Sequence, residues 1–221
     1  MNINMKDTFR HQGLRKKLVD TVRSKGIKDE KVLEAIGIVP RHLFMDSSFV
    51  EFAYKDNAFP IAAGQTISQP FTVAYQTELL QVKKTDKILE VGTGSGYQAC
   101  VLYEMGAFVY SIERQRELYL HAKKMLPEMG YNIKMFFGDG YAGLPSFAPF
   151  NKIIVTAGAP EIPEALVKQL KPGGIMVIPV NLKNSSGVQI MTTVTKTETG
   201  ETNIKQWDTF RFVPLLHNKE Y

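Results

Sequence analysis

The N-terminal part of the chain begins with apolar residues at helical spacing. Phe9, Leu14, Leu18 and Val22 recur at intervals close to those of a helix, which predicts a helix over residues 5–24. Charged residues of both signs fill many of the positions between them. We therefore expect one face of this helix to be buried and the other to be solvated.

A second short helix is predicted within KDEKVLEAIGIVP. It must end near Pro40, because proline disfavours the helical conformation in the residue before it. Residues 41–70 then show little periodicity, and a stretch of this length in a compact domain is usually functional or wraps around the core. Residues 71–82 return to helical spacing directly after the polar segment GQTISQP.

From Lys87 onward, short apolar runs alternate with helical patterns. The predicted strands are KILEVG (87–92), AFVYSIE (107–113), NIKMFFGDG (132–140), NKIIVTAG (151–158) and GGIMVIPV (173–180). The predicted helices between them span residues 97–105, 114–129 and 161–170. Strands that alternate with helices indicate right-handed crossovers and a mostly parallel sheet.

The last part of the chain, residues 188–215, reads as two strands joined at TETGET, which predicts an antiparallel hairpin at the sheet edge. The whole pattern predicts an α/β fold with a doubly wound, mostly parallel sheet of seven strands. We expect a single domain over residues 1–221. It would comprise an N-terminal helical arm and loop (1–70), an α/β core (71–180) and C-terminal antiparallel strands (181–221).

The composition is that of an ordinary globular protein. Of the 221 residues, 44% are hydrophobic and 22% are charged, which allows a sizeable core. The net charge of +5 permits weak attraction to anions. Much of the excess lies in the first 45 residues, where Lys and Arg alternate with Asp and Glu. This mixture is typical of a solvated helix face, so we expect no nucleic-acid partner.

Cys100 is the only cysteine, which excludes a disulfide within the chain and a cysteine metal cluster. Its apolar helical context, QACVLYEM, predicts a buried structural thiol. No apolar run resembles a signal peptide, and no stretch approaches the roughly 18 apolar residues of a membrane span. We therefore expect a cytoplasmic protein with no membrane partner.

The loop EVGTGSGYQA joins a predicted strand to a predicted helix and has glycines at positions 92, 94 and 96. The dinucleotide fingerprint G-x-G-x-x-G would need a glycine where Tyr97 stands, so the spacing does not fit a nicotinamide site. These glycines still let the backbone turn sharply and approach a ligand at a helix N-terminus. A simple tight turn would have the same composition.

Three acidic residues are expected at the carboxyl edge of the sheet, where open α/β sheets bind ligands. Glu90 lies two residues before the first glycine, Glu113 ends the second predicted strand, and Asp139 ends the third. Glu90 would attract an ammonium or sulfonium group, Glu113 is placed for ribose hydroxyls, and Asp139 suits an adenine amino group. Each alone could be a solvated strand end or a helix cap, but the three together favour a ligand site.

These features resemble a class I S-adenosylmethionine-dependent methyltransferase with a Rossmann-like sheet. More narrowly, the segments VPRHLFM, YKDNAFPI, GQTISQPFTVAYQTELL, EALVKQLKPGGIMVIPV and RFVPL, between residues 39 and 215, are similar to the protein-L-isoaspartate O-methyltransferase family. TISQP is the most specific of them. The resemblance implies a repair enzyme that transfers a methyl group from S-adenosyl-L-methionine to the carboxyl of L-isoaspartyl residues in damaged proteins and peptides. S-adenosyl-L-homocysteine would be released, and the methyl ester would convert to a succinimide.

The resemblance also implies an active-site serine at Ser68, which would orient the isoaspartyl carboxyl by hydrogen bonding. The alternative role of Ser68 is to cap the helix that begins near Pro70. The expected cofactor-binding residues are Gln65, Thr66, Glu90, Gly92, Thr93, Gly94, Ser95, Gly96, Glu113, Arg114, Gly138, Asp139 and Gly140. The expected substrate-binding residues are Ser68, Gln69, Arg211 and Val213, with RFVPL holding a peptide as an added strand.

This chemistry needs neither a general base nor a metal. A carboxylate acceptor is already ionised at neutral pH, because its pKa is about 4. His11, His42, His121 and His217 lie in scattered contexts, and we expect each to be structural. What remains for the protein is to align the acceptor oxygen with the methyl group and to remove water.

Two alternatives stay open at this point: another class I methyltransferase that acts on a small molecule or nucleic acid, and a cofactor-binding protein without turnover. After the fourth predicted strand the chain has TAGAP in place of the Asn/Asp-Pro-Pro-aromatic motif of enzymes that methylate base nitrogens. Ser68 beside the three acids argues against a sensor that lacks activity. The sequence leaves the oligomeric state open, with a monomer favoured.

Overall fold

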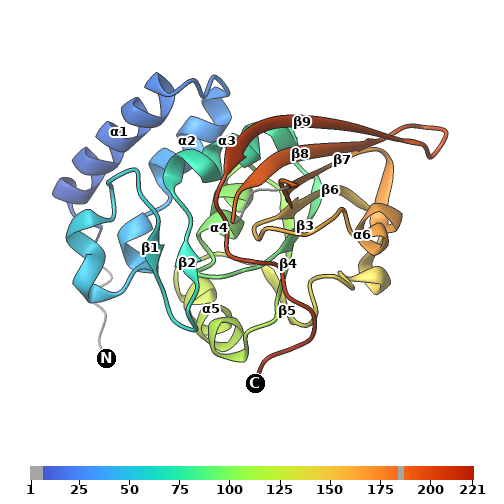
Figure 1. Ribbon diagram of the computed structural model, residues 1–221. Coiled ribbons are helices and arrows are strands. Elements are labelled where there is room, and N and C mark those ends of the chain that lie inside the picture. The colour runs from blue at the N-terminus through green and yellow to red at the C-terminus, as the bar shows by residue number, and fades with distance from the viewer. Residues whose placement is uncertain (1–6, 184–186) are drawn as a thin grey trace.

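The computed structural model describes residues 7–183 and 187–221 and is built around a seven-stranded sheet with the order β5-β4-β3-β6-β7-β8-β9 (Figure 1). The strands are β3 (Lys87–Val91), β4 (Phe108–Glu113), β5 (Lys134–Phe137), β6 (Phe150–Val155), β7 (Leu170–Asn181), β8 (Gln189–Lys196) and β9 (Thr202–Phe210). Strands β3 to β7 are parallel, and β8 and β9 are antiparallel to their neighbours. The predicted mostly parallel sheet with an antiparallel end is therefore confirmed.

Helices cover both faces of this sheet because successive strand residues point to opposite sides. Ile88 packs in a buried cluster with residues of helices α3 (Pro70–Leu80) and α4 (Tyr97–Glu104). Its neighbour Leu89 packs in a second cluster with residues of α6 (Glu164–Gln169). Helix α5 (Arg116–Glu128) connects β4 to β5.

The N-terminal arm consists of two helices that pack against α3. Helices α1 (Phe9–Ser24) and α2 (Glu30–Ile38) bury Leu18 and Ile36 in one cluster with Val73 of α3. Both helices lie within a few residues of their predicted positions. Cys100 is fully buried in the same cluster, which agrees with the predicted structural thiol.

The stretch over residues 41–70 is more ordered than its sequence indicates. It contains the 3₁₀ helices η1 (Arg41–Phe44) and η2 (Ser47–Phe52) and a small antiparallel pair, β1 (Phe59–Pro60) with β2 (Thr66–Ile67). Elements of two to six residues are too short to leave a periodic pattern in the sequence, so only the tertiary contacts reveal them.

The start of α2 is joined to α3 by one carboxylate. The Glu78 Oε1 atom on α3 accepts hydrogen bonds from the backbone N–H groups of Lys28 (2.6 Å) and Asp29 (2.7 Å). These donors lie just before α2, where backbone N–H groups have no partner within the helix. Glu78 therefore ties the arm to the core of the molecule.

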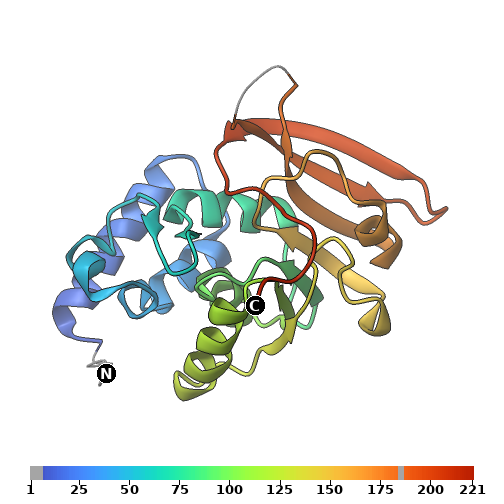
Figure 2. The same ribbon diagram turned by 60° about the horizontal axis from the view of Figure 1, so that its bottom comes forward.

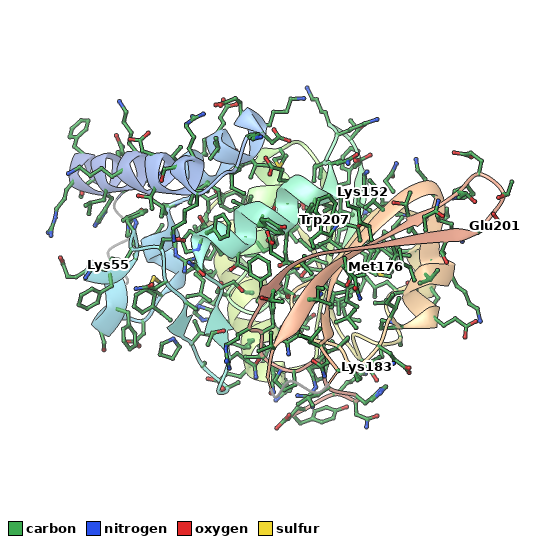
Figure 3. All side chains as sticks on the ribbon, turned by 45° about the horizontal axis from the view of Figure 1, so that its top comes forward. Lys55, Lys152, Met176, Lys183, Glu201 and Trp207 are labelled. Atoms are coloured by element: carbon green, nitrogen blue, oxygen red, sulfur yellow. The ribbon has the colours of Figure 1, made fainter. Side chains whose placement is uncertain are left out.

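The two ends of the sheet differ in their surroundings. The β8–β9 hairpin projects away from the arm, with Glu201 near its tip and Lys55 at the opposite end of the molecule (Figure 3).

After β9 the chain turns back and runs across the sheet edge toward α5 (Figure 2). Parallel bridges between Gly158 and Pro214 and between Gln115 and Glu220 fix this C-terminal segment. Within the described ranges, no helix combines the length and apolar character needed to cross a bilayer.

We propose that the arm and the sheet unfold as one unit, because the arm shares a buried cluster with α3 and α4, which pack on the sheet, and is joined to α3 by Glu78. Calorimetry of the wild type should therefore show a single transition. Removing the acceptor in Glu78→Ala leaves two N–H groups without their partner, and we expect the melting temperature to fall by about 3–6 °C. Glu78→Gln, which keeps an oxygen acceptor, should lower the melting temperature by less than Glu78→Ala does. Separate transitions for the arm and the sheet would contradict the proposal.

Candidate active site

The loop between β3 and α4 packs so closely on the end of β6 that its first residue must be a glycine. Gly92 has a φ of +96°, and a Cβ atom there would lie 2.5 Å from the Thr156 Oγ1 atom. The Thr156 hydroxyl donates to the Gly92 carbonyl oxygen at 2.7 Å. The backbone of this glycine loop therefore turns at the carboxyl edge of the sheet.

Glu113, the last residue of β4, is directed at the same loop. Its carboxylate is 5% exposed and accepts the Gly94 N–H at 2.9 Å and the Gln115 N–H at 2.8 Å. A carboxylate has about four lone-pair sites, so these two bonds leave capacity for a ligand hydroxyl. The side chain thus holds the glycine loop and also faces the cavity beside it.

That cavity lies at the carboxyl ends of β3, β4 and β6. The predicted cofactor-binding residues that line it are Gln65, Thr66, Gly92, Thr93, Gly94, Ser95, Glu113, Arg114 and Gly140. The remaining predicted residues, Glu90, Gly96, Gly138 and Asp139, are not among its lining residues. The sheet reverses its strand order at this edge, which is where α/β folds bind ligands.

Glu90 lies behind the glycine loop instead of in the cavity. It is fully buried, and its Oε2 atom accepts a hydrogen bond from the Ser111 hydroxyl at 2.5 Å. The Ser111 hydroxyl also lies 2.6 Å from the Thr93 hydroxyl, so Glu90 supports the loop through two side chains. Burial, together with the nearby charge of Glu113, raises the pKa of Glu90 to about 8, against the lowering effect of the Ser111 hydrogen bond. Direct contact of Glu90 with a ligand amine stays a prediction.

Asp139 is engaged by the C-terminal segment. Its carboxylate accepts the backbone N–H groups of Tyr141 and Asn218, each at 2.9 Å. The His217 ring stacks on the Tyr141 ring with 3.7 Å between the ring centroids. Asp139 therefore anchors the chain terminus at the carboxyl edge of the sheet, a role that its FGDG context did not indicate.

Arg114 holds the same segment from the other side. Its guanidinium donates to the Asn218 carbonyl oxygen (2.9 Å) and to the Glu220 carboxylate (2.8 Å). Residues 213–216 of this segment line the cavity. The C-terminal segment is thus a wall of the site. Sequence reasoning named RFVPL (211–215) as a peptide-holding segment, but it did not place these residues or Leu216 beside the glycine loop.

Ser68 lies where this cavity meets a second cleft. Both hollows are lined by Ser68, Thr66, Thr156 and Val213. The predicted substrate residues Gln69 and Arg211 line only the second cleft, together with Phe71, Phe210 and Phe212. The four predicted substrate-binding residues are therefore brought together. Two of them, Ser68 and Val213, line both hollows, and of these two only Ser68 has a polar side chain.

The alternative role of Ser68 as a helix cap is wrong. Helix α3 begins at Pro70, its N-cap residue is Gln69, and the Gln69 side chain makes no capping bond. The Phe71 N–H is bound by the Asp56 carboxylate at 2.7 Å. Because another residue fills the capping role, the Ser68 hydroxyl is not used for it.

Two of the four histidines are close together in space. His11 and His42 have ring centroids 3.8 Å apart, and with Asp7 they offer metal-ligand atoms within 4.8 Å of one another. Arg15 donates to both Asp7 carboxylate oxygens, at 3.0 and 2.8 Å, and this hydrogen bonding is the main reason that the pKa of Asp7 is lowered. The carboxylate is already neutralised by a guanidinium, which favours a structural role for the group.

Comparisons with known proteins agree on one family. The model of the family described as Protein-L-isoaspartate(D-aspartate) O-methyltransferase (PCMT) matches residues 13–220. The protein-L-isoaspartate O-methyltransferase of Christiangramia forsetii is 61% identical over 97% of this chain and 100% of the relative. The corresponding protein of Flavobacterium psychrophilum is 58% identical over the same shares of each chain.

Solved structures give the same result. A protein-L-isoaspartate O-methyltransferase structure is similar with a TM-score of 0.83 and 30% identity, over 92% of this chain and 66% of that longer chain. A Plasmodium falciparum structure described as a beta-aspartate methyltransferase (PCMT), in complex with S-adenosyl-L-homocysteine, has a TM-score of 0.79 and 26% identity. That match covers 92% of this chain and 99% of the other.

The buried Glu90 carboxyl predicts a pH-dependent stability. In the unfolded chain it ionises near 4.5, whereas in the folded protein it stays protonated up to about pH 8. Folding then requires proton uptake between these values, so the wild type loses stability as pH rises through this window. Glu90→Gln removes this dependence, and its stability relative to the wild type should rise by at most about 1.4 kcal/mol per pH unit.

Denaturant unfolding of both ligand-free proteins at pH 5, 6.5 and 8 measures this difference. A stability difference that stays constant over the three pH values would contradict a buried, protonated Glu90.

Proposed function

Because the chain belongs to the protein-L-isoaspartate(D-aspartate) O-methyltransferase family, we propose that Ser68 marks the point where its methyl donor and its acceptor meet. The protein is a repair methyltransferase that transfers a methyl group from S-adenosyl-L-methionine to the carboxyl of L-isoaspartyl residues in damaged proteins and peptides. The methyl ester then converts to a succinimide. The observation that carries the placement is that Ser68 lines both hollows at the sheet edge.

The cavity and the second cleft are proposed to bind different molecules. The cavity beside the glycine loop suits the donor, because it is lined both by this loop, whose glycines let the backbone approach a ligand, and by the Glu113 carboxylate. The same family includes a structure bound to S-adenosyl-L-homocysteine, which supports this assignment. When bound, the donor supplies a methyl group activated by a positively charged sulfur.

The second cleft suits an extended peptide. Its walls include the exposed Arg211 and several aromatic side chains, so it offers both a positive charge and apolar surface. The backbone from Arg211 to Val213 continues from the edge strand β9 and can hold a peptide by main-chain hydrogen bonds. Recognition through the main chain would allow many damaged proteins to bind.

Ser68 is proposed to orient the acceptor carboxylate. Its hydroxyl can donate to one carboxylate oxygen and leave the other free to attack the methyl group in line with the departing sulfur. The acceptor is already ionised, so no proton has to be removed from it. Among the described side chains, no hydrogen bond joins Ser68 to a histidine, so the geometry gives no support to a serine nucleophile.

Three further properties are proposed: metal-independent catalysis, a monomeric state and a cytoplasmic location. We propose that catalysis needs no metal, since neither the ionised nucleophile nor the sulfonium leaving group requires a Lewis acid, and chelator-treated enzyme should keep full activity. A monomeric state and a cytoplasmic location are proposed from the sequence, and sedimentation and cell fractionation test them.

Ser68→Ala should lower kcat by roughly 100-fold, because one positioned hydrogen bond to the reacting group is lost. The dissociation constant of S-adenosyl-L-homocysteine should change less than about twofold, since Ser68 acts on the acceptor. Turnover is measured with labelled donor and either an isoaspartyl peptide or the matching aspartyl peptide. Titration calorimetry gives the dissociation constant of S-adenosyl-L-homocysteine. Ser68→Thr, which keeps a hydroxyl, is the matched variant.

Base-labile label in the isoaspartyl peptide alone is the expected result for the wild type. Label in neither peptide, with the donor still bound, would instead indicate a binding protein without turnover. Equal losses of turnover and product affinity in Ser68→Ala would contradict the acceptor-side role.

Glu113→Ala should weaken S-adenosyl-L-homocysteine binding by about 10- to 100-fold, because hydrogen bonds from ribose hydroxyls to a carboxylate are lost. Glu117→Ala is the control, since Glu117 is an exposed acid of the same segment that does not line the cavity. Titration calorimetry gives both dissociation constants. An unchanged dissociation constant in Glu113→Ala would contradict the ribose assignment.

A further inference from the structure

The segment that carries Ser68 has little secondary structure to hold it in place. It follows the two-residue strand β2 and enters α3 at Pro70, which has no N–H group. The N-cap residue Gln69 makes no side-chain cap, so the first turn of α3 needs an acceptor from another part of the chain.

Asp56, 12 residues before Ser68 in the sequence, supplies that acceptor. Its Oδ1 atom accepts the Phe71 N–H at 2.7 Å, and its Oδ2 atom accepts the Gln69 Nε2 amide at 3.0 Å. The Asp56 carbonyl oxygen accepts from the same amide, also at 3.0 Å. One residue therefore binds both Gln69 and Phe71, which lie on the C-terminal side of the serine.

The charge of Asp56 is neutralised by the N-terminal arm. The Lys25 Nζ atom, at the C-terminal end of α1, lies 2.5 Å from the Asp56 Oδ2 atom, and the Asp56 side chain is only 6% exposed. Lys25 also lies over the Phe71 ring at 5.7 Å from its centroid. This ion pair offsets the negative charge of Asp56 close to the segment that carries Ser68.

Arg41 provides a second positive charge nearby and, unlike Lys25, is fully buried. Its guanidinium donates to the Asn57 carbonyl oxygen at 3.3 Å and lies against the Tyr97 ring at 4.9 Å from the ring centroid. Burial lowers the pKa of Arg41 to about 10, so it stays charged at neutral pH. The residue that follows Asp56 is thus held by a side chain of η1.

We propose that Asp56 is a positioning residue for methyl transfer, which sets the orientation of the Ser68 hydroxyl by fixing Gln69 and Phe71. The inference rests on the proposed role of Ser68. Asp56 lines neither the donor cavity nor the peptide cleft, so it acts only through the segment it binds. Lys25 makes the N-terminal arm part of the same support.

Asp56→Ala should lower kcat for an isoaspartyl peptide by about 10- to 100-fold, because a shift of the positioned group by about 1 Å has an effect of this size. The dissociation constant of S-adenosyl-L-homocysteine should stay within about twofold of the wild type. Asp56→Asn keeps an oxygen for the Phe71 N–H but directs an amide at Lys25 or Gln69. We expect the kcat of Asp56→Asn to be about 3- to 10-fold lower than that of the wild type.

A double-mutant cycle with Ser68→Ala separates positioning from simple loss of stability. If Asp56 acts through Ser68, adding Asp56→Ala to Ser68→Ala should lower kcat by less than about threefold. All variants are assayed below their melting temperatures, as measured by circular dichroism. If the alanine variant does not fold, the same cycle is run with Asp56→Asn.

Asp46→Ala is the matched control. Asp46 also caps a helix, by accepting the Ser48 N–H at 2.9 Å at the start of η2, but among the described residues it makes no hydrogen bond to the segment that carries Ser68. Its kcat should be unchanged. A folded Asp56→Ala with wild-type kcat, or additive losses in the cycle, would overturn the inference. If Ser68→Ala itself kept wild-type kcat, the proposed role of Ser68 would fail instead.

Discussion

Between β3 and β6 the sheet reverses the direction in which strands are added, and the loops at the carboxyl ends of these strands diverge there. The space left between them is the cavity that we propose for the donor. The glycine loop can follow its tight course only because Gly92 has no side chain to meet Thr156, and because Glu113 satisfies the Gly94 N–H. The donor site depends on this packing of loop backbone against the ends of β4 and β6.

The two termini of the chain complete what the sheet begins. The N-terminal arm supports the Ser68 segment through Lys25 and Asp56, and it is joined to α3 at the other end by Glu78. The C-terminal segment forms another wall and is fixed by Arg114 and Asp139. The cavity at the sheet edge is therefore walled by segments from both parts of the chain, and the second cleft lies beside it.

Electrostatics at the site follow from which acids are paired. Asp56 forms an ion pair with Lys25, and Glu113 accepts hydrogen bonds from two backbone N–H groups. Glu90 has no such compensation, and burial keeps it protonated near neutral pH. Of these three acids, only Glu113 lines the cavity proposed for the cationic donor, so its carboxylate is the one placed to face that ligand.

The sequence by itself determined the alternation of strands and helices, the glycine loop at positions 92 to 96, and the position of Ser68 beside a helix start. These features depend on local rules: apolar periodicity, the conformational freedom of glycine and the missing N–H of proline. Only the tertiary structure decided that Asp56 caps α3, that Glu90 points behind the loop and that residues near Asn218 reach Asp139. Acidic residues look alike in a sequence, and their partners here come from distant parts of the chain, so packing alone selects which of them supports the site.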